Sequence, residues 1–433
     1  MEMVQWDNLK GEFTMKRQVT AGLLGFLFLL STMFSLTGCN RDTGKVHAAD
    51  LMDGIKPNQT IDAYLTDEQT DAIADFSVKL FHNTVADGKN PLISPISVLC
   101  ALAMTANGAQ GETLSQMEKV FGLPVPELNE YLHIYMDNLP SGKKYKVHPA
   151  NSIWFKDDDR LKVEKDFLQT NADSYGASVY KAAFDDSTRK DINHWVSKNT
   201  DGMIPDILDQ IPEEAVMYLV NALAFDAEWE KIYTENDIQD GTFTTESGKK
   251  KNVKMMYGGE HMYLDSGNAT GFLKYYADRK YAFAALLPDE GISIQDAIAG
   301  LTGRELRNTL RDAQETAVNA AIPKFESRST FEMQDVLSGM GMTDAFDADR
   351  ADFTRLGWYD NGNIFINRVL HKTYIAVDEK GTRAGAATVA EMETGSAMLE
   401  EKNVCLDRPF VYLLLDCEKN LPLFMGAVTD IGK

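Results

Sequence analysis

The chain is poor in cysteine and histidine, and this limits the kinds of structure it can form. Only four cysteines and seven histidines occur among its 433 residues. Four cysteines are too few to hold together a small secreted scaffold, and no two of them have the spacing of a zinc site. No two histidines stand four residues apart, as paired metal ligands on a helix would. We therefore expect neither a metal site nor another cofactor.

The cysteines differ in their surroundings. Cys100 lies in the apolar run SVLCALAM, so we expect it to be a small buried hydrophobic residue. Cys405 and Cys417 lie near the end of the chain and could pair across neighbouring strands. The sequence leaves both the paired and the free state open for them.

Positive charge is also scarce. The chain has 43 Lys and Arg residues against 65 Asp and Glu residues, which gives a net charge of -22. So acidic a surface disfavours binding to nucleic acid or to an anionic membrane surface.

Catalytic motifs are absent as well. The sequence has no Gly-x-Ser-x-Gly elbow, no His-Glu-x-x-His motif, no phosphate-binding loop and no dinucleotide fingerprint. Ser94 and Ser97 offer hydroxyl groups, but no base adjoins them in the sequence. We therefore predict that the protein is not an enzyme.

The start of the chain resembles an export signal. Lys16 and Arg17 form a short basic region, and residues 19–36 are uncharged and strongly apolar. The run ends in LTGC, which resembles the signal of bacterial lipoproteins and implies that Cys39 is lipidated. The protein would then be exported and anchored in a bacterial membrane, facing the periplasm or displayed at the cell surface. The alternative is an uncleaved anchor, because about 18 apolar residues can just span a bilayer.

We divide the chain into three parts. Residues 1–38 form the lipoprotein-type export signal, with a short extension before it. Residues 39–60 are polar, contain two glycines and a proline, and are expected to form a tether. Residues 61–433 contain no linker, repeat or low-complexity tract. Their composition is that of a globular protein with a large core, so they are predicted to form one domain.

Helical patterns come first in this domain, and strand patterns follow. Thr66 and Gln69 form a capping box, and Ile73, Phe76 and Leu80 follow them at helical spacing. Strand-like apolar runs cover residues 218–225, 281–288, 319–325 and 410–416. This order predicts an α+β fold.

The segment VDEKGTRAGAATVAEMETGSAMLEE, residues 377–401, has the pattern of a strand and the composition of a loop. After Gly381, the even positions up to Met392 are small or neutral, whereas Arg383 and Glu391 fall on odd positions. A period of two is typical of a strand with one buried face. Three glycines and few large apolar residues are instead typical of an exposed loop. The local pattern leaves both interpretations open.

Seven blocks, in order along residues 61–433, together resemble the serpin family. They are NPLISPISVLCALAMTANGAQGETLSQM (90–117), NSIWFKDDDRLKVEKDFLQTNADSYGASV (151–179), INHWVSKNTDGMIPDIL (192–208), YLVNALAFDAEWEKIY (218–233), IPKFESRSTFEMQDVLSGMGMTDAF (322–346), VDEKGTRAGAATV (377–389), and RPFVYLLLD with PLFMGAV (408–416, 422–428). The resemblance implies a single α+β domain with three β-sheets, about nine helices and an exposed reactive-centre loop.

The resemblance also implies a mechanism. In this family a target protease attacks the reactive-centre loop and forms an acyl-enzyme with it. The freed loop inserts as a new strand in the central sheet, and the attached protease is carried to the opposite pole and distorted. The resemblance therefore implies a monomeric inhibitor whose partner is a protease. The alternative is a non-inhibitory serpin that binds or carries another molecule, but a hinge of small residues favours the inhibitor.

The hinge is assigned from the resemblance to Glu379, Gly381, Thr382, Ala384, Ala386 and Thr388. We expect the hinge to be exposed in the active form, and its even positions to face the core after insertion. A buried unpaired charge at an even position would cost several kcal/mol. Arg383 departs from the family, in which an acid is usual, but its odd position would face solvent.

Two positions for the reactive bond are open. Counting from the hinge places it at Gly395–Ser396, whereas counting back from the RPF motif places it near Met398–Leu399. Residues 384–401 contain no Lys or Arg, so trypsin-like targets are disfavoured. We expect an elastase-like, subtilisin-like or papain-like protease as the partner.

Two further sites are assigned from the resemblance. Ser94, Ser97, Asn221 and His371 match the polar cluster beneath the centre of the sheet, which must part during insertion. Trp229 matches the tryptophan near the point where the loop enters the sheet. The alternative for each residue is an ordinary hydrogen-bonded polar side chain or a packed aromatic ring.

Overall fold

The structure is a computed structural model, and it describes residues 46–58, 64–85, 89–212, 215–299, 301–360, 362–382 and 401–431. All of these residues belong to one compact unit. The expected export signal with Cys39 lies outside the described residues, and so do the predicted loop residues Ala384, Ala386, Thr388, Gly395, Ser396, Met398 and Leu399. No helix within the described ranges is long and apolar enough to cross a membrane.

Nine α-helices occur in the described part of the chain. They are α1 (Asp67–His82), α2 (Pro95–Ala106), α3 (Gly111–Phe121), α4 (Val125–Asp137), α5 (Lys165–Tyr175), α6 (Asp186–Asn199), α7 (Ile294–Ala299), α8 (Gly303–Arg311) and α9 (Gln334–Gly339). α1 begins with the predicted capping box, in which the side chains of Thr66 and Gln69 each accept a hydrogen bond from the other residue's backbone N–H. Every residue of α2 is buried, in keeping with its almost wholly apolar sequence.

The described strands form three β-sheets, which confirms the expected α+β fold. The large sheet has the order β1-β5-β3-β6-β15-β14-β12. Its strands are β1 (Ala49–Asp50), β5 (Ser178–Ala182), β3 (Tyr145–Lys156), β6 (Met217–Glu228), β15 (Gly381–Thr382), β14 (Arg368–Val377) and β12 (Phe325–Glu332).

The second sheet has nine strands in the order β16-β11-β8-β9-β10-β17-β18-β2, with β7 paired to β8. Its strands are β16 (Lys402–Cys405), β11 (Gln314–Pro323), β8 (Lys250–Asp265), β9 (Ala269–Tyr275), β10 (Tyr281–Pro288), β17 (Phe410–Asp416), β18 (Leu421–Val428), β2 (Leu92–Ile93) and β7 (Ile238–Thr244). The third sheet pairs β4 (Leu161–Val163) with β13 (Gly357–Tyr359).

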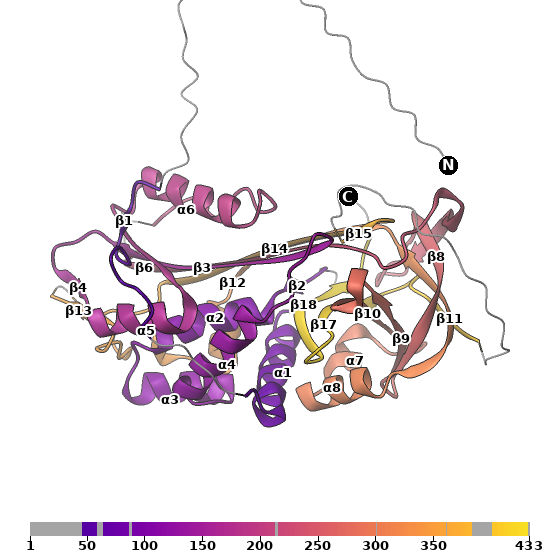
Figure 1. Cartoon of the computed structure of the whole chain (residues 1–433), viewed down its shortest axis with the longest axis horizontal. Helices are drawn as coiled ribbons and strands as arrows, with labels where there is room; N and C mark the ends of the chain where they lie inside the picture. Colours follow the sequence, from indigo (N-terminus) through magenta and orange to yellow (C-terminus); the bar gives the residue numbers. More distant parts are fainter. Residues whose placement is uncertain are drawn as a thin grey trace, which may run out of the picture. The chain divides into compact units, whose positions relative to one another are not determined.

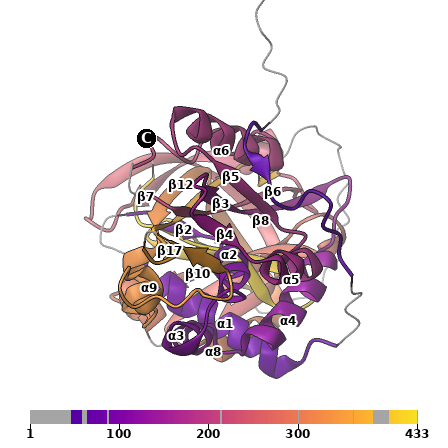
Figure 2. The ribbon, with the colours of Figure 1, turned by 90° about the vertical axis from the view of Figure 1, so that its left-hand side faces the viewer.

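The large sheet separates two layers of unequal thickness. In Figure 1, β3, β6, β12 and β14 run side by side, with α6 on one side and α2 and α5 on the other. Figure 2 shows the same arrangement from the end of the sheet, with α1, α3, α4 and α8 grouped on the thicker side. On the thinner side, α6 buries Ile192, Trp195 and Val196 against the sheet. The larger hydrophobic core lies against the opposite face of the sheet. The part of the large sheet that lies against α6 is therefore covered on both faces.

The three cysteines that the structure describes are all free thiols. Cys100 is buried in α2, as expected. Of the two states left open for Cys405 and Cys417, the structure has the free one, with no disulfide between them.

Candidate functional site in the seam between β6 and β14

The site lies along the line where β6 and β14 meet, which we call the seam. At one end the two strands pair directly and in parallel, residues 218–222 with residues 368–372. At the other end β15 lies between them, and Thr382 pairs antiparallel with both Ala227 and Val377. Where β6 and β14 pair directly, each residue of β6 is paired with the residue 150 positions later in the chain. The two partners of Thr382, Ala227 and Val377, are also 150 positions apart. β6 and β14 therefore keep one register along the seam, and an added strand fits between them without a shift.

The two residues of β15 are buried. A Cβ atom on Gly381 would lie 2.0 Å from the Ala227 carbonyl oxygen, so only glycine fits there. Thr382 is 0% exposed, and its Oγ1 lies 2.5 Å from the Tyr276 hydroxyl. The expectation of an exposed hinge is therefore wrong for these two residues, because Gly381 is paired with β6 and Thr382 is paired with both β6 and β14. Thr382 faces the interior, the direction expected of even positions.

A hydrogen-bonded turn joins β14 to β15. The Asp378 N–H donates to the Gly381 carbonyl over 3.0 Å, and the Lys380 N–H donates to the Asp378 carboxylate over 2.8 Å. The Glu379 carboxylate lies 2.5 Å from Lys324 Nζ, and this contact lowers the pKa of Glu379. Because Lys324 directly precedes β12, the ion pair fastens the turn to the neighbouring strand.

Trp229 holds the same turn from the other side. Its backbone N–H donates to the Lys380 carbonyl and its indole N–H donates to the Asp378 carbonyl, each over 2.8 Å. The indole stacks on the Tyr276 ring at 4.4 Å, and the buried Lys274 Nζ lies 5.3 Å from the indole ring. Trp229 thus fixes the place where the chain enters the seam.

The four residues of the predicted polar cluster come together in the middle of the seam, and all are fully buried. The Ser94 N–H donates to His371 Nε2 over 2.9 Å, and His371 Nδ1 lies 2.8 Å from Asn221 Oδ1. The Asn221 amide donates to the Ser97 carbonyl and, over 2.5 Å, to Asn151 Oδ1. The cluster joins β3, β6 and β14 to the start of α2.

The contacts of His371 define its protonation state. Its Nε2 accepts a hydrogen bond from a backbone N–H, so Nε2 carries no proton. Nδ1 faces a carbonyl-type oxygen of Asn221 and therefore carries the single proton of a neutral ring. Burial lowers the pKa of His371 to about 3, which is consistent with the neutral form.

Two features of the cluster were not predicted from the sequence. Ser94 and Ser97 contribute backbone groups, and their hydroxyl groups make no hydrogen bond within the described structure. Asn151 was not assigned to the cluster, although it pairs directly with Asn221 across β3 and β6. It lies in the middle of β3, and its only signal in the sequence is that it and Ser152 are polar residues before the apolar run IWF.

No group of three or more His, Cys, Asp and Glu side chains is arranged to hold a metal ion in the part of the chain that the structure describes.

Comparison with known proteins agrees with this geometry. The family described as "Serpin (serine protease inhibitor)" matches residues 71–431. The chain belongs to the serpin family. Leukocyte elastase inhibitor of Xenopus laevis is 30% identical over 364 residues, covering 79% of this chain and 93% of that protein.

Two solved structures show the same fold. The thermophilic serpin tengpin in its native state is 47% identical, with a TM-score of 0.86, and the match covers 89% of this chain and 100% of tengpin. Tengpin in its latent state gives a TM-score of 0.76 at 44% identity, covering 86% of this chain and 100% of that chain. This serpin therefore resembles the native state more closely than the latent state.

Proposed function

We propose that this serpin inhibits serine proteases, with papain-like cysteine proteases as a second target class, by trapping them as covalent acyl-enzymes. The observation that carries the proposal is β15. Its two residues lie between β6 and β14 in a register that a longer strand could continue. Insertion of the reactive loop into the central sheet is the inhibitory mechanism of the family.

The register predicts which residues would meet after cleavage. If the chain continued antiparallel to β6 from the pair of Thr382 with Ala227, Thr388 would lie between Asn221 and His371. Insertion would then separate the two side chains that close the middle of the seam. The strand would reach the first residue of β6 at Met392, so the reactive bond would be carried to the far end of the sheet.

The energetics favour insertion. Filling the seam would add backbone hydrogen bonds over about ten residues, on the order of 10 kcal/mol at about 1 kcal/mol each. The even positions that would enter the interior are small or neutral, so no buried charge opposes the process. The uncleaved protein is then held by a kinetic barrier.

The target class follows from the loop sequence. The two candidate bonds, Gly395–Ser396 and Met398–Leu399, present small or medium-sized residues. A relative named leukocyte elastase inhibitor supports an elastase-like target, and subtilisin-like and papain-like proteases remain in the proposal.

A protease panel tests the function. We expect elastase or subtilisin, and not trypsin, to give a serpin–protease band that survives boiling in denaturant. Mass spectrometry of the released peptide would identify the cleaved bond. Cleavage by every protease of the panel without such a band would contradict inhibition.

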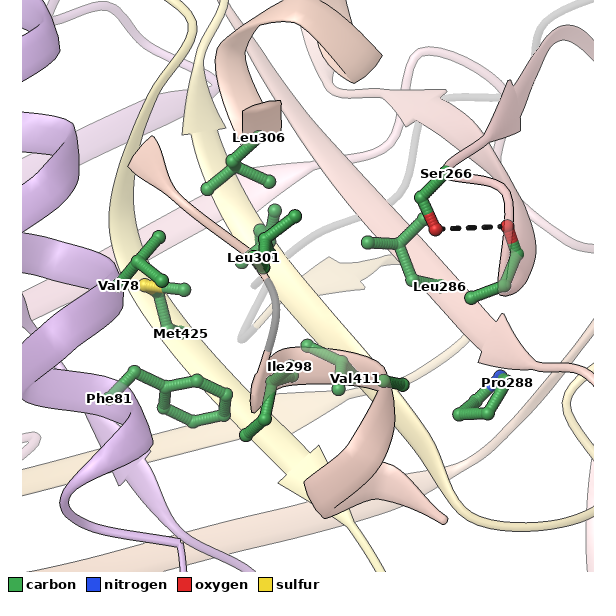
Figure 3. Close-up of a pocket in the computed structure, with 13 residues that line it drawn as sticks. Val78, Phe81, Ser266, Leu286, Pro288, Ile298, Leu301, Leu306, Val411 and Met425 are labelled. Atoms are coloured by element: carbon green, nitrogen blue, oxygen red, sulfur yellow. Dashed lines mark hydrogen bonds between the residues drawn. The ribbon is translucent and has the colours of Figure 1, made fainter. Parts of the chain in front are cut away.

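A carrier function gains no support from the apolar pocket beside α1. An apolar pocket lies between α1, the α7–α8 region and the second sheet, and the side chains of Phe81, Leu301 and Val411 converge on it (Figure 3). Its free volume is about 20 Å³, which is room for about one water molecule. Ligand sites for drug-sized molecules are typically 300–1,000 Å³. This pocket therefore offers no preformed place for a carried molecule of that size.

We also propose that the protein is a lipoprotein anchored through Cys39, as its LTGC sequence indicates. The variant Cys39→Ser should fold normally and lose membrane association, because it has no thiol for the lipid. Fractionation of cells that produce each form measures this. Equal membrane retention of both forms would favour the uncleaved anchor instead.

A further inference from the structure

A second cavity lies between the end of α4, the residues before α1 and the turn that follows β17. Its volume is about 310 Å³, enough for a small organic molecule. Its polar and aromatic lining includes Tyr64, Tyr135, Asp416, Glu418 and Lys419. None of these residues contributes to the seam.

Asp416 is the decisive residue of this cavity. It is the last residue of β17 and is only 3% exposed. Its carboxylate accepts a hydrogen bond from the Glu418 N–H over 2.9 Å but has no ion pair with a described Lys, Arg or His. Lys419 pairs instead with Glu418 at the rim, over 3.3 Å. Because it is buried without a cationic partner, the pKa of Asp416 is raised, and a bound cation would favour its charged form.

The Tyr135 hydroxyl is a second unsatisfied group in the same cavity. Tyr135 is 3% exposed, and its hydroxyl makes no hydrogen bond of normal geometry within the described structure. Burial, followed by the nearby charge of Asp416, raises the pKa of Tyr135. The hydroxyl is therefore neutral and can accept a hydrogen bond from a ligand beside the carboxylate.

The surroundings favour a positive charge. α4 has 13 residues and ends at Asp137, so its C-terminal carbonyl groups place partial negative charge at the cavity. Tyr64 lies at the mouth with 95% of its surface exposed, and its ring face could cover a bound cation. Glu418 and Lys419 form an ion pair at the rim, so these two side chains add no net charge.

We propose that this cavity binds an ammonium group, with the Asp416 carboxylate as its counter-ion and the Tyr135 hydroxyl as a second acceptor. The ammonium group can come from a free alkyl diamine or from a lysine side chain of a peptide. The site is independent of protease inhibition, so either function can fail without the other.

Calorimetric titration of the full chain tests the proposal. The probes are diaminopentane, its neutral analogue pentanediol, and N-acetyl-lysine methylamide. We expect a Kd of about 1 mM or tighter for at least one of the two ammonium probes, and at least tenfold weaker binding of pentanediol. The tighter of the two ammonium probes identifies the source of the group.

Three variants assign the binding to this cavity. Asp416→Asn should weaken ammonium binding at least tenfold, whereas Asp159→Asn, in an exposed loop away from the cavity, should leave it unchanged. Tyr135→Phe removes only the unsatisfied hydroxyl and should weaken binding about two- to fivefold, which preserves the test if Asp416→Asn does not fold. Equal binding of diaminopentane by wild type and both cavity variants would overturn the proposal. So would equal binding of the diol, or no ammonium binding at about 10 mM probe.

Discussion

His371 is the residue that links the middle of the seam to pH. Its folded pKa is about 3, whereas a histidine in the unfolded chain titrates near 6.5. Between these values the unfolded state binds more protons than the folded state. The stabilising contribution of neutral His371 is therefore complete above about pH 6.5 and is lost as the pH falls towards 3, by up to about 1.4 kcal/mol per pH unit.

This predicts the behaviour of His371→Gln. The thermal unfolding midpoint of the wild type, measured at one scan rate, should fall between pH 7 and pH 4.5. The midpoint of His371→Gln should fall less over the same range, because the variant has no buried group to protonate. The exposed His261 provides the control, since His261→Gln should follow the wild type. Parallel curves for all three proteins would contradict the assignment.

The burial of Thr382 leads to a second prediction about a single residue. Thr382→Arg should lower the thermal midpoint of the uncleaved protein, because residue 382 is already buried and a buried unpaired charge costs on the order of 3 kcal/mol. Thr382→Val, which keeps the volume and loses the contact with Tyr276, should cost about 1 kcal/mol. An unchanged midpoint for Thr382→Arg would mean that β15 is not part of the uncleaved sheet.

The seam as an element predicts how insertion depends on side-chain direction. In the continued register, residue 384 would lie between the buried Phe225 and Ile375, whereas residue 383 would lie beside Asp226 on the outer face. Ala384→Glu should therefore convert the inhibitor into a substrate, because a barrier raised by about 1.4 kcal/mol changes the partition between insertion and hydrolysis tenfold.

The matched control introduces the same charge one residue away. Arg383→Glu places two acids side by side on the outer face, which costs at most about 1 kcal/mol. Its inhibitory stoichiometry against the protease that wild type inhibits should stay within a few-fold of normal. If the two variants behave alike, the alternation of the segment has no mechanical role.

Individual elements could be predicted where the local chemistry is self-contained. The capping box at Thr66 and the strand over residues 281–288 depend on near neighbours alone, and the structure has both. The run over residues 319–325 was predicted as one strand, but β11 ends at Pro323 and β12 begins at Phe325 in a different sheet. The division depends on long-range pairing, which no local pattern contains.

The site was predictable to a different degree. The resemblance to serpins predicted the four residues of the polar cluster, and the structure brings them together. The sequence could not show which of their atoms form hydrogen bonds. The backbone contributions of Ser94 and Ser97 and the contact of Asn151 with Asn221 depend on three strands and a helix meeting. The burial of Gly381 and Thr382 was missed because composition alone cannot tell a paired residue from an exposed one.

The whole molecule should become more stable when it is cut. Cleavage within residues 392–399 would free the segment to fill the seam, and the added backbone hydrogen bonds should raise the thermal midpoint by well over 10 °C, on the scale of about 10 kcal/mol. Scanning calorimetry of the intact and the cut protein measures this. A midpoint that stays the same or falls after cleavage would show that the uncut fold is already the more stable one.

The constant offset between β6 and β14 also constrains how this protein can change over evolutionary time. One residue gained or lost between Thr382 and Met392 would turn every later side chain of an inserted strand to the opposite face. The same change beyond Met392 would leave the inserted part in register, because that stretch would lie past the first residue of β6. Insertions and deletions should therefore be tolerated on the side of the segment that meets the protease, and eliminated on the side that meets the sheet. The specificity of this serpin can then diversify in length as well as in sequence while its trapping step stays the same.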